Sequence, residues 1–441
     1  MMPKFESILS TILVLSLTAS ISWAQFADIE PLPGAPYSSS ATVPPTLSKV
    51  FTGTYTGSGT GREAQARDAL AQMKDDFDKT GIGMDAVINV RGYLKVLSTD
   101  LEENATAMAE WNAAFNDAFG DNTLPPTRTT FGVYELADPE AVIAIEAVAA
   151  VPAQSGVEGV PFNANPKALT LETEHQPVSM TAPFSSMVLT SGILADPVSD
   201  EPRAFGDMAQ QTTSALKKLE AALRHWGLTP QDVVYVRSLL SPEVIEDVTE
   251  PVPVDFAGYQ EAFDAYWASN FRDSPPTAEF AAPGFNSTGR IVEIEFYAVF
   301  PDSASHTFAG DDSLSYLHRR EGSETSFLNR SAAIARDASM VWFAGVIDQT
   351  RDHIHSQAVN ALLTLEERMM NAGVSFENIV QLRAYLQIEN GFRTDFNDWN
   401  TAYKRFFNAP SVNPEKPIRT AFPVISIPGT AVIELEAIGV K

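Results

Sequence analysis

Arginine and glutamate are the residues of this sequence most able to do chemistry. Its 441 residues include no cysteine, so thiolate nucleophiles, disulfides and cysteine-bound zinc are excluded. The formal net charge of −26 argues against nucleic acid as a partner, because phosphate binding needs a basic surface. An anionic substrate would need a local positive group, and a guanidinium is always charged and binds a carboxylate with two hydrogen bonds. Individual arginines are therefore the first candidates for a binding site.

Three arginines recur at a fixed interval inside apolar, strand-like runs. The runs cover residues 87–94, 233–240 and 379–386. They contain Arg91, Arg237 and Arg383, and 237 − 91 and 383 − 237 both equal 146. Internal repeats preserve structural residues as well as functional ones, so ion pairs at domain interfaces are the preferred interpretation of these arginines.

Two predicted helices flank each run, and the first of them recurs at the same interval. The first opens at Gln65, Gln211 or Gln357 and closes at Gly81, Gly227 or Gly373, where a glycine suits a C-cap. The second follows the run, and its apolar and aromatic residues are spaced +3, +4, +4, which places them on one helix face. These residues are Met108, Trp111, Phe115 and Phe119; Phe256, Tyr259, Phe263 and Trp267; and Phe396, Trp399, Tyr403 and Phe407.

The repeat predicts three homologous domains, at residues 25–155, 165–302 and 313–441. The stretches 156–166 and 301–312 are rich in Gly, Pro, Asn, Ser and Asp and are predicted linkers. Each domain reads as strands, helix, strand, helix and strands, an α+β unit with two helices on one face of a mainly antiparallel sheet. The last strand of the second and third domains alternates apolar residues with glutamate, as a half-exposed strand does. The uncovered sheet face needs a partner, which the other copies can supply.

The first 24 residues have the features of a signal peptide. Lys4 precedes a mostly apolar run over residues 8–21, and the small residues Ser22 and Ala24 suit cleavage after Ala24. A retained membrane anchor is the alternative, but the run is shorter than the about 20 residues that span a bilayer. We therefore expect a soluble periplasmic or secreted protein that does not contact the membrane after cleavage.

The third copy carries a series of short motifs in a recognisable order. Residues 400–407 follow the pattern N-x-x-Y-x-x-F-F, residues 417–419 follow P-x-R, and residues 427–429 are similar to the L-P-x that comes next. Residues 433–438 are similar to a terminal V-E-I-E-A-I strand, and Phe343-Ala344-Gly345 stands where a strand would end in S-G. Together these motifs resemble the RidA (YjgF-type) family of imine deaminases over nearly all of the third domain.

The other two copies match the RidA pattern with losses. The first has Arg128 in its P-x-R motif, Asn112, a strand end at residues 51–53 and a G-P-Y-like stretch at residues 34–37, but Ala144 where the third has Glu434. The second has Thr190-Ser191-Gly192 and Glu293, but Ala278 replaces the arginine and Gln260 the asparagine. The resemblance implies a chorismate-mutase-like fold and homotrimers with a site in each cleft between subunits. For this chain it implies a monomer that forms an intramolecular pseudo-trimer with three inequivalent clefts.

The resemblance also implies hydrolysis of 2-imino or enamino acids to 2-keto acids and ammonia, with no metal and no organic cofactor. It implies that Arg419 binds the substrate carboxylate and acts together with Glu434, which would hold the attacking water or shuttle a proton. Backbone groups at Gly345 and the side chain of Asn400 would contribute to substrate binding. Arg128 would bind a carboxylate in another cleft, one without a counterpart of Glu434 in its own domain.

Several alternatives stay open. The chain could be a non-catalytic protein that binds small carboxylates in the inter-domain clefts, or its role could be purely structural. Glu434 alternates with apolar residues, which by itself predicts a solvent-facing side chain. Glu293 would need an arginine from a neighbouring domain, and the pair His353 and His355 lacks an evident third metal ligand. The family often has cysteine two residues after the motif arginine, and the corresponding residues here are Thr130, Phe280 and Ala421.

Overall fold

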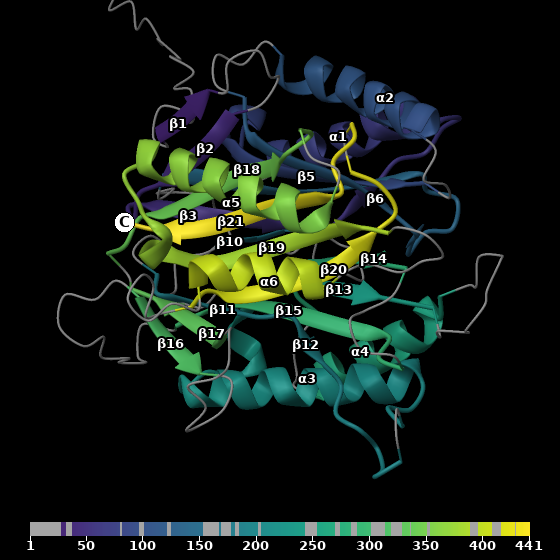
Figure 1. Cartoon of the computed structure of the whole chain (residues 1–441). Coiled ribbons are helices and arrows are strands. Elements are labelled where there is room, and N and C mark those ends of the chain that lie inside the picture. The colour runs from purple at the N-terminus through teal and green to yellow at the C-terminus, as the bar shows by residue number, and fades with distance from the viewer. Residues whose placement is uncertain are drawn as a thin grey trace, which may run out of the picture.

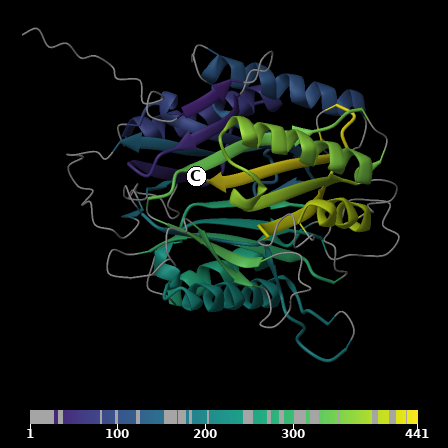
Figure 2. The ribbon, with the colours of Figure 1, turned by 60° about the vertical axis from the view of Figure 1, so that its left-hand side comes forward.

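The computed structural model of the chain describes most of the sequence (Figures 1 and 2). The described residues are 28–31, 38–79, 82–96, 101–120, 125–152, 167–168, 178–180, 185–201, 204–242, 254–269, 274–283, 289–300, 314–318, 329–335, 337–350, 353–388, 396–407, 416–427 and 429–441. The predicted signal peptide, the stretch 34–37, both predicted linkers and Gly81 lie outside them. Within the described ranges, no helix combines the length and the apolar character needed to cross a membrane.

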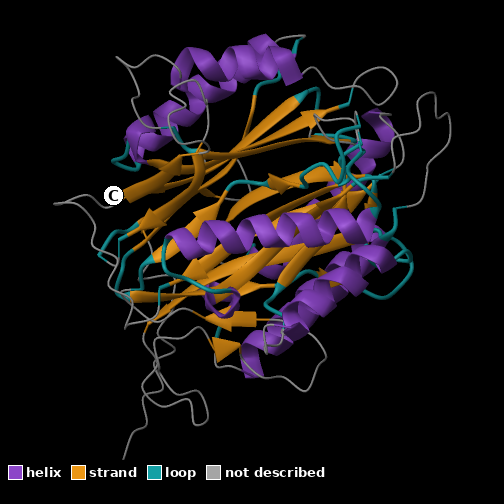
Figure 3. Ribbon diagram, turned by 90° about the horizontal axis from the view of Figure 1, so that it is seen from below, coloured by secondary structure: helices purple, strands orange, loops and turns teal. Residues whose placement is uncertain are grey.

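The fold is a mixed α+β arrangement in which curled sheets occupy the interior and helices lie outside them (Figures 1 and 3). The helices pack in pairs, α1 with α2, α3 with α4 and α5 with α6. The described residues form six α-helices: α1 (Arg62–Lys79), α2 (Leu101–Phe119), α3 (Met208–His225), α4 (Phe256–Ser269), α5 (Ile354–Asn371) and α6 (Phe396–Phe407). One short 3-10 helix follows the first helix of each pair: η2 (Met84–Ala86) after α1, η3 (Pro230–Asp232) after α3 and η4 (Phe376–Asn378) after α5.

A similar order of strands and helices occurs three times along the chain, with differences in the short strands. The N-terminal segment, residues 28–152, contains β1 (Asp28–Pro31), β2 (Ser38–Val43), β3 (Leu47–Thr52), β4 (Tyr55–Thr56), β5 (Val87–Lys95), β6 (Thr127–Val133), β7 (Glu135–Leu136) and β8 (Ile143–Pro152). The middle segment, residues 167–300, contains β9 (Lys167–Ala168), β10 (Val178–Met180), β11 (Met187–Thr190), β12 (Ile193–Leu194), β13 (Val233–Leu240), β14 (Thr277–Ala281) and β15 (Val292–Val299). The C-terminal segment, residues 314–441, contains β16 (Leu314–His318), β17 (Asn329–Ile334), β18 (Met340–Ile347), β19 (Ile379–Gln387), β20 (Ile418–Val424) and β21 (Ile433–Val440).

The three arginine-containing runs form the central strand of each segment, as predicted. These strands are β5, β13 and β19. Each pairs antiparallel with the last strand of its segment and parallel with the strand that follows the second helix. The remaining pairings are mainly antiparallel, so the sheets have the predicted character.

Strands near the start of each segment pair with a neighbouring segment. The second strand of the N-terminal segment, β2, pairs with β18 of the C-terminal segment. In the same way β17 pairs with β11 of the middle segment, and β10 pairs with β3 of the N-terminal segment. The exchange runs once around a closed cycle, so each segment completes the sheet of another.

The recurring glutamines and glycines have structural roles. Gln211 donates from Nε2 to the Gly289 carbonyl (2.9 Å) and accepts from the Ile291 N–H (2.9 Å), which ties α3 to the start of β15. Gln65 and Gln357 make the same pair of bonds in α1 and α5. The helices begin three residues before these glutamines. Gly227 and Gly373 follow α3 and α5 with φ of +73° and +76°, the left-handed conformation expected for a helix-ending glycine.

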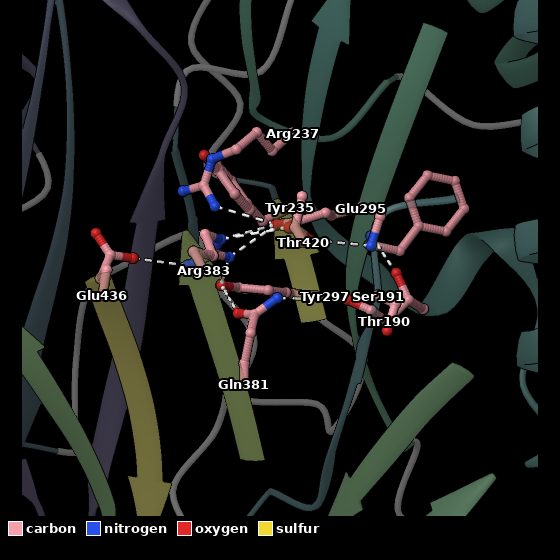
Figure 4. A network of polar contacts seen from close by, with 12 residues as sticks. Thr190, Ser191, Tyr235, Arg237, Glu295, Tyr297, Gln381, Arg383, Thr420 and Glu436 are labelled. Atoms are coloured by element: carbon pink, nitrogen blue, oxygen red, sulfur yellow. Dashed lines mark hydrogen bonds and ion pairs between the residues drawn. The ribbon is translucent and has the colours of Figure 1, made fainter. Parts of the chain in front are cut away.

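A closed ring of six charges lies at the centre of the molecule. Its members are Arg91, Arg237, Arg383, Glu146, Glu295 and Glu436, each at most 2% exposed. Every arginine contacts the glutamate of its own segment and that of a neighbour: Arg91 to Glu146 (2.8 Å) and Glu436 (2.5 Å), Arg383 to Glu436 (2.7 Å) and Glu295 (2.8 Å), and Arg237 to Glu295 (3.1 Å) and Glu146. Figure 4 shows part of this ring. The predicted ion pairs between repeats are confirmed.

The ring corrects one prediction about the last strands. Their alternating glutamates suggested half-exposed strands, but β15 and β21 are buried along their whole length. Glu295 of β15 and Glu436 of β21 belong to the ring instead of facing solvent. Two apolar clusters, which contain side chains from all three segments, include the tyrosines of the strands that carry the ring: Tyr235 and Tyr297 in one, and Tyr93 and Tyr385 in the other.

The charges of the ring stabilise one another. Burial alone would raise the pKa of Glu146, Glu295 and Glu436, but the arginines on either side of each carboxylate lower it below 4.5. All three therefore stay ionised at neutral pH. A buried ion pair that loses one partner leaves an uncompensated charge, which is the costly case.

We predict that Arg237→Leu destabilises the protein by roughly 3–5 kcal/mol, because Glu146 and Glu295 each lose one of their two arginines. Urea unfolding followed by circular dichroism would measure the change. Arg67→Ala is the control, since Arg67 is 41% exposed in its side chain and its pairs with Glu63 and Asp117 lie on the surface. That variant should differ by about 1 kcal/mol or less. Equal losses in the two variants would contradict a central role for the ring.

Candidate active site

Three junctions between segments surround the ring. At junction A, β6 of the N-terminal segment lies beside β18 of the C-terminal segment. At junction B, β20 of the C-terminal segment meets the end of β11 in the middle segment. At junction C, β14 of the middle segment meets the end of β3, where the Thr54 N–H donates to the Thr277 carbonyl (3.0 Å). Each junction joins a different pair of segments.

The structure does not bring Arg419 and Glu434 together, although the sequence suggested one site built on both. Arg419 on β20 pairs with Leu382 of β19, whereas Glu434 on β21 pairs with Tyr385 on the other side of β19. Their Cα atoms are thus separated by about 10 Å along the strands and about 10 Å across them.

The two side chains also leave opposite faces of the sheet. The Arg419 guanidinium lies over the rings of Trp399 (5.6 Å) and Tyr403 (4.9 Å) on α6, on the helix side. Glu434 is two residues from ring member Glu436, so it points to the inner face. Because Arg419 and Glu434 point to opposite faces of the same sheet, they cannot contact one substrate molecule.

Glu434 instead meets the N-terminal segment at junction A. The backbone N–H of Thr130 donates to its carboxyl group, and Arg128 lies close enough to act on its charge. Burial raises the pKa of Glu434 well above 4.5, and the Glu436 carboxylate raises it further, although Arg128 and Arg368 act in the opposite direction. Glu434 is 4% exposed and Arg128 8% exposed. Junction A therefore combines a carboxyl group that favours its protonated form with a guanidinium from another segment.

Gly345 shapes junction A by its lack of a side chain. A Cβ at this position would overlap Oε1 of Glu434. The pairing of β18 with β21 shifts register between Phe343 and Val346, so Gly345 sits in a β-bulge. Bulges are common beside active sites because they redirect the chain. Arg368 of α5 reaches the same bulge, with Nη1 3.4 Å from the Gly345 carbonyl oxygen.

Junction B repeats part of this arrangement with other residues. A Cβ at Gly192 would overlap Oε1 of Glu293, as at Gly345 and Glu434. The Arg419 N–H donates to Ser191 Oγ (3.0 Å), and the Gly192 N–H donates to Thr420 Oγ1 (3.0 Å). Arg419 of the C-terminal segment thus lies beside the Gly192 and Glu293 end of the middle segment.

The register corrects two correspondences drawn from the sequence. Arg128 pairs with Val90 and Arg419 with Leu382, and the equivalent Val236 pairs with Thr277 rather than Ala278. Thr52 accepts the N–H of Ala147, and Thr190 accepts the N–H of Phe296, the equivalent residue of β15. Thr52 is therefore equivalent to Thr190, and the residue equivalent to Gly192 is Thr54 rather than Gly53. In each case the sequence comparison was wrong by one residue: it chose Ala278 instead of Thr277 in β14, and Gly53 instead of Thr54 after β3.

Junction C consequently lacks the groups found at the other two. Thr277 replaces the arginine, Ala144 replaces the glutamate, and Thr54 replaces the glycine. A side chain at Thr54 is tolerated because no glutamate needs the space. The residue two positions after the arginine is Thr130 at A, Ala421 at B and, after the correction, Glu279 at C.

The threonine after each arginine differs in its hydrogen bonds. Thr420 Oγ1 accepts from Gly192 and donates to ring member Glu295. Thr129 occupies the same register at junction A, yet its buried Oγ1 has no hydrogen-bond partner among the described residues. Oε2 of Glu434 is likewise buried without one. Unsatisfied buried polar atoms cost about 1–3 kcal/mol each, so they call for an explanation at junction A.

The remaining predicted residues are placed as follows. Asn400 lies on α6, where its buried Oδ1 has no hydrogen-bond partner among the described residues; Asn112 on α2 is the same. His353 precedes α5 and His355 lies in its first turn. In the part of the chain that the structure describes, no three His, Asp or Glu side chains are grouped to hold a metal ion.

Solved structures similar to the chain come from several bacteria. TdcF of E. coli with bound serine is 28% identical, covers 23% of this chain and 80% of its own, and has a TM-score of 0.21. A member of the YjgF/YER057c/UK114 family from Mycobacterium tuberculosis is 26% identical, covers 28% and 99%, and has a TM-score of 0.20. The YjgF gene product of E. coli is 26% identical, covers 23% and 80%, and has a TM-score of 0.21. No curated protein matches the chain.

A family match covers the end of the sequence. The family described as Endoribonuclease L-PSP matches residues 330–441, which include β18 to β21, α5 and α6. The match falls on the copy whose motifs carried the resemblance, and it does not extend to the other two. Residues 330–441 are therefore similar to the Endoribonuclease L-PSP family, and the similar solved structures include members of the YjgF family.

Proposed function

We propose that the chain is three tandem RidA-like domains assembled as an intramolecular pseudo-trimer, and that it hydrolyses 2-imino or enamino acids to 2-keto acids and ammonia at junction A. The observation that carries the proposal is the approach of Arg128 and the Thr130 N–H to Glu434 across two segments. The threefold order of elements, the cyclic exchange of strands and the closed ring support the pseudo-trimer.

Arg128 is suited to the substrate carboxylate. Its guanidinium stacks over the Phe115 ring (4.8 Å), which fixes its plane on the helix side of β6. A guanidinium held in one plane loses little freedom when it forms two parallel bonds to a carboxylate. The imine carbon of the bound substrate would then lie between Arg128 and Glu434.

Glu434 is suited to the proton transfers. In its protonated form it gives a proton to the imine nitrogen, and the resulting carboxylate takes one from the water that attacks the carbon. The carbinolamine then receives that proton on nitrogen, the C–N bond breaks, and ammonia leaves as the hydroxyl proton returns to Glu434. One water is consumed, one ammonia is released, and Glu434 ends protonated as it began.

RNA cleavage, which the family description names, fits this chain less well. The net charge is −26, and Arg128 and Arg419 are only 8% and 6% exposed. A phosphate backbone needs an accessible basic surface. Small carboxylates need only one guanidinium. Export after cleavage at Ala24 remains part of the proposal, and it would place the reaction in the periplasm or outside the cell.

We predict that Glu434→Gln lowers kcat/KM by about 100-fold or more, because the amide cannot transfer a proton. Arg128→Ala should lower kcat/KM by roughly 10- to 100-fold, because a charged pair with the substrate carboxylate is lost. The assay measures ammonia and keto acid released from an imino acid that an amino-acid oxidase generates in situ.

Arg67→Ala, on the exposed surface of α1, is the matched control and should keep the wild-type rate. All proteins are first compared by circular dichroism. If the wild-type protein accelerates no imino acid over buffer, but binds a keto acid in a manner that needs Arg128, the chain is a carboxylate-binding protein and the deaminase proposal fails.

We also predict that Glu434→Gln becomes increasingly more stable than the wild type as the pH rises above 4.5. The carboxyl group ionises first in the unfolded chain, because its pKa in the folded protein is raised, so rising pH favours unfolding of the wild type. The advantage of the variant should grow by about 1.4 kcal/mol per pH unit across this window. Urea unfolding between pH 4 and 8 measures it, with Glu63→Gln on the exposed part of α1 as the control. A difference that does not change with pH would show that Glu434 is ionised in the folded protein.

A further inference from the structure

Junctions A and B contain the same types of charged residue but not the same hydrogen bonds. The comparison rests on Thr129 and Thr420, which pair with Arg91 and Arg383 at equivalent positions of β5 and β19. Both threonines are 1% exposed. They are chemically identical, so any difference in their bonds comes from the junctions around them.

At junction B the threonine is fully engaged. Thr420 Oγ1 accepts a hydrogen bond from the Gly192 N–H (3.0 Å) and donates one to ring member Glu295. Thr420 and Glu295 are both labelled in Figure 4. Ser191 Oγ adds a second crossing bond, because it accepts the Arg419 N–H (3.0 Å). The strand end of the middle segment is therefore bonded directly to β20.

At junction A the equivalent hydroxyl forms no such bridge. Thr129 Oγ1 and Glu434 Oε2 are both buried without a hydrogen-bond partner among the described residues. Ala344 stands where junction B has Ser191, so the second crossing bond is also missing. Arg368 reaches the Gly345 carbonyl from α5, whereas the residue at the same position of α3, 146 residues earlier, is Ala222. The two junctions thus differ at the threonine hydroxyl: Thr420 Oγ1 is hydrogen-bonded on both sides at junction B, whereas Thr129 Oγ1 at junction A has no partner among the described residues.

We propose that Thr420 and Ser191 hold junction B closed, so that each chain binds one substrate molecule, at junction A. The inference rests on the proposed function in taking the ligand to be a small 2-keto or 2-imino carboxylate. At junction B the Gly192 N–H already donates to Thr420 Oγ1, so it is not available to a ligand. Junction C has neither the arginine nor the glutamate, so it binds none. Thr420 acts as a positioning residue that links junction B to the central ring.

Equilibrium dialysis against radiolabelled 2-oxobutanoate, a product-like keto acid, tests the stoichiometry. We expect one molecule bound per wild-type chain at saturation. Arg128→Ala should weaken binding by at least tenfold, whereas Arg419→Ala should still bind one molecule with unchanged affinity. Two molecules per wild-type chain, or loss of binding in Arg419→Ala, would overturn the inference. Absence of any binding to the wild type would overturn it as well.

A matched pair of threonine variants tests the closure itself. Thr420→Val keeps the side-chain volume and removes both hydrogen bonds of the hydroxyl, so a second molecule of keto acid should bind. Thr129→Val makes the same change where the hydroxyl has no partner, and it should add no second site. Thr420→Val should also melt at a lower temperature than Thr129→Val. A single bound molecule in a folded Thr420→Val protein would show that Thr420 does not close junction B.

The stoichiometry does not depend on turnover, because the keto acid is not hydrolysed. Ammonia release with two bound molecules per chain would support the deaminase and reject closure of junction B. One bound molecule without ammonia release would support closure and reject the deaminase. The two proposals can therefore fail separately.

Discussion

The ring of three arginines and three glutamates is the interaction on which the rest of the structure depends. Each charged side chain contacts two side chains of opposite charge that belong to different segments. Separating one segment from the other two would therefore leave unpaired charges. Ions this deeply buried have lost their hydration, and only close geometry on both sides compensates that loss. The ring therefore ties each segment to both of the others by direct ion pairs.

The same ring sets the chemistry of the candidate site. Glu434 and Glu436 are two residues apart on one face of β21, yet their environments shift their pKa values in opposite directions. Glu436 lies between two arginines and is ionised. Glu434 lies beside that negative charge in a buried position, which favours its protonated form. Two carboxyl groups with opposed pKa values are a common basis for assigning an acid, and here one belongs to the scaffold and the other to the site.

The sequence predicted the parts of the fold that local pattern determines. The interval of 146 residues located the central strands, the first helix of each segment and the arginines of the ring. Pattern could not distinguish the inner glutamates from exposed ones, because Glu295 and Glu436 alternate with apolar residues as surface residues do. Nor could it show that Arg128 lies close to Glu434, since the pairing of segments is a property of the assembly. Single-residue offsets misplaced Thr54 and Thr277, because only the hydrogen-bond register shows which residues of the three segments are equivalent.

The three copies also differ in a way that separates structural from chemical requirements. All three keep the arginine and glutamate of the ring, whereas the junction arginine, glutamate and glycine are present at A and B and all absent at C. The glycine follows the glutamate for a steric reason, because a Cβ at Gly192 or Gly345 would overlap the carboxylate beside it. Once Ala144 removes the carboxylate, Thr54 is permitted. The ring residues are thus kept in every copy, whereas the three junction residues are lost together at junction C.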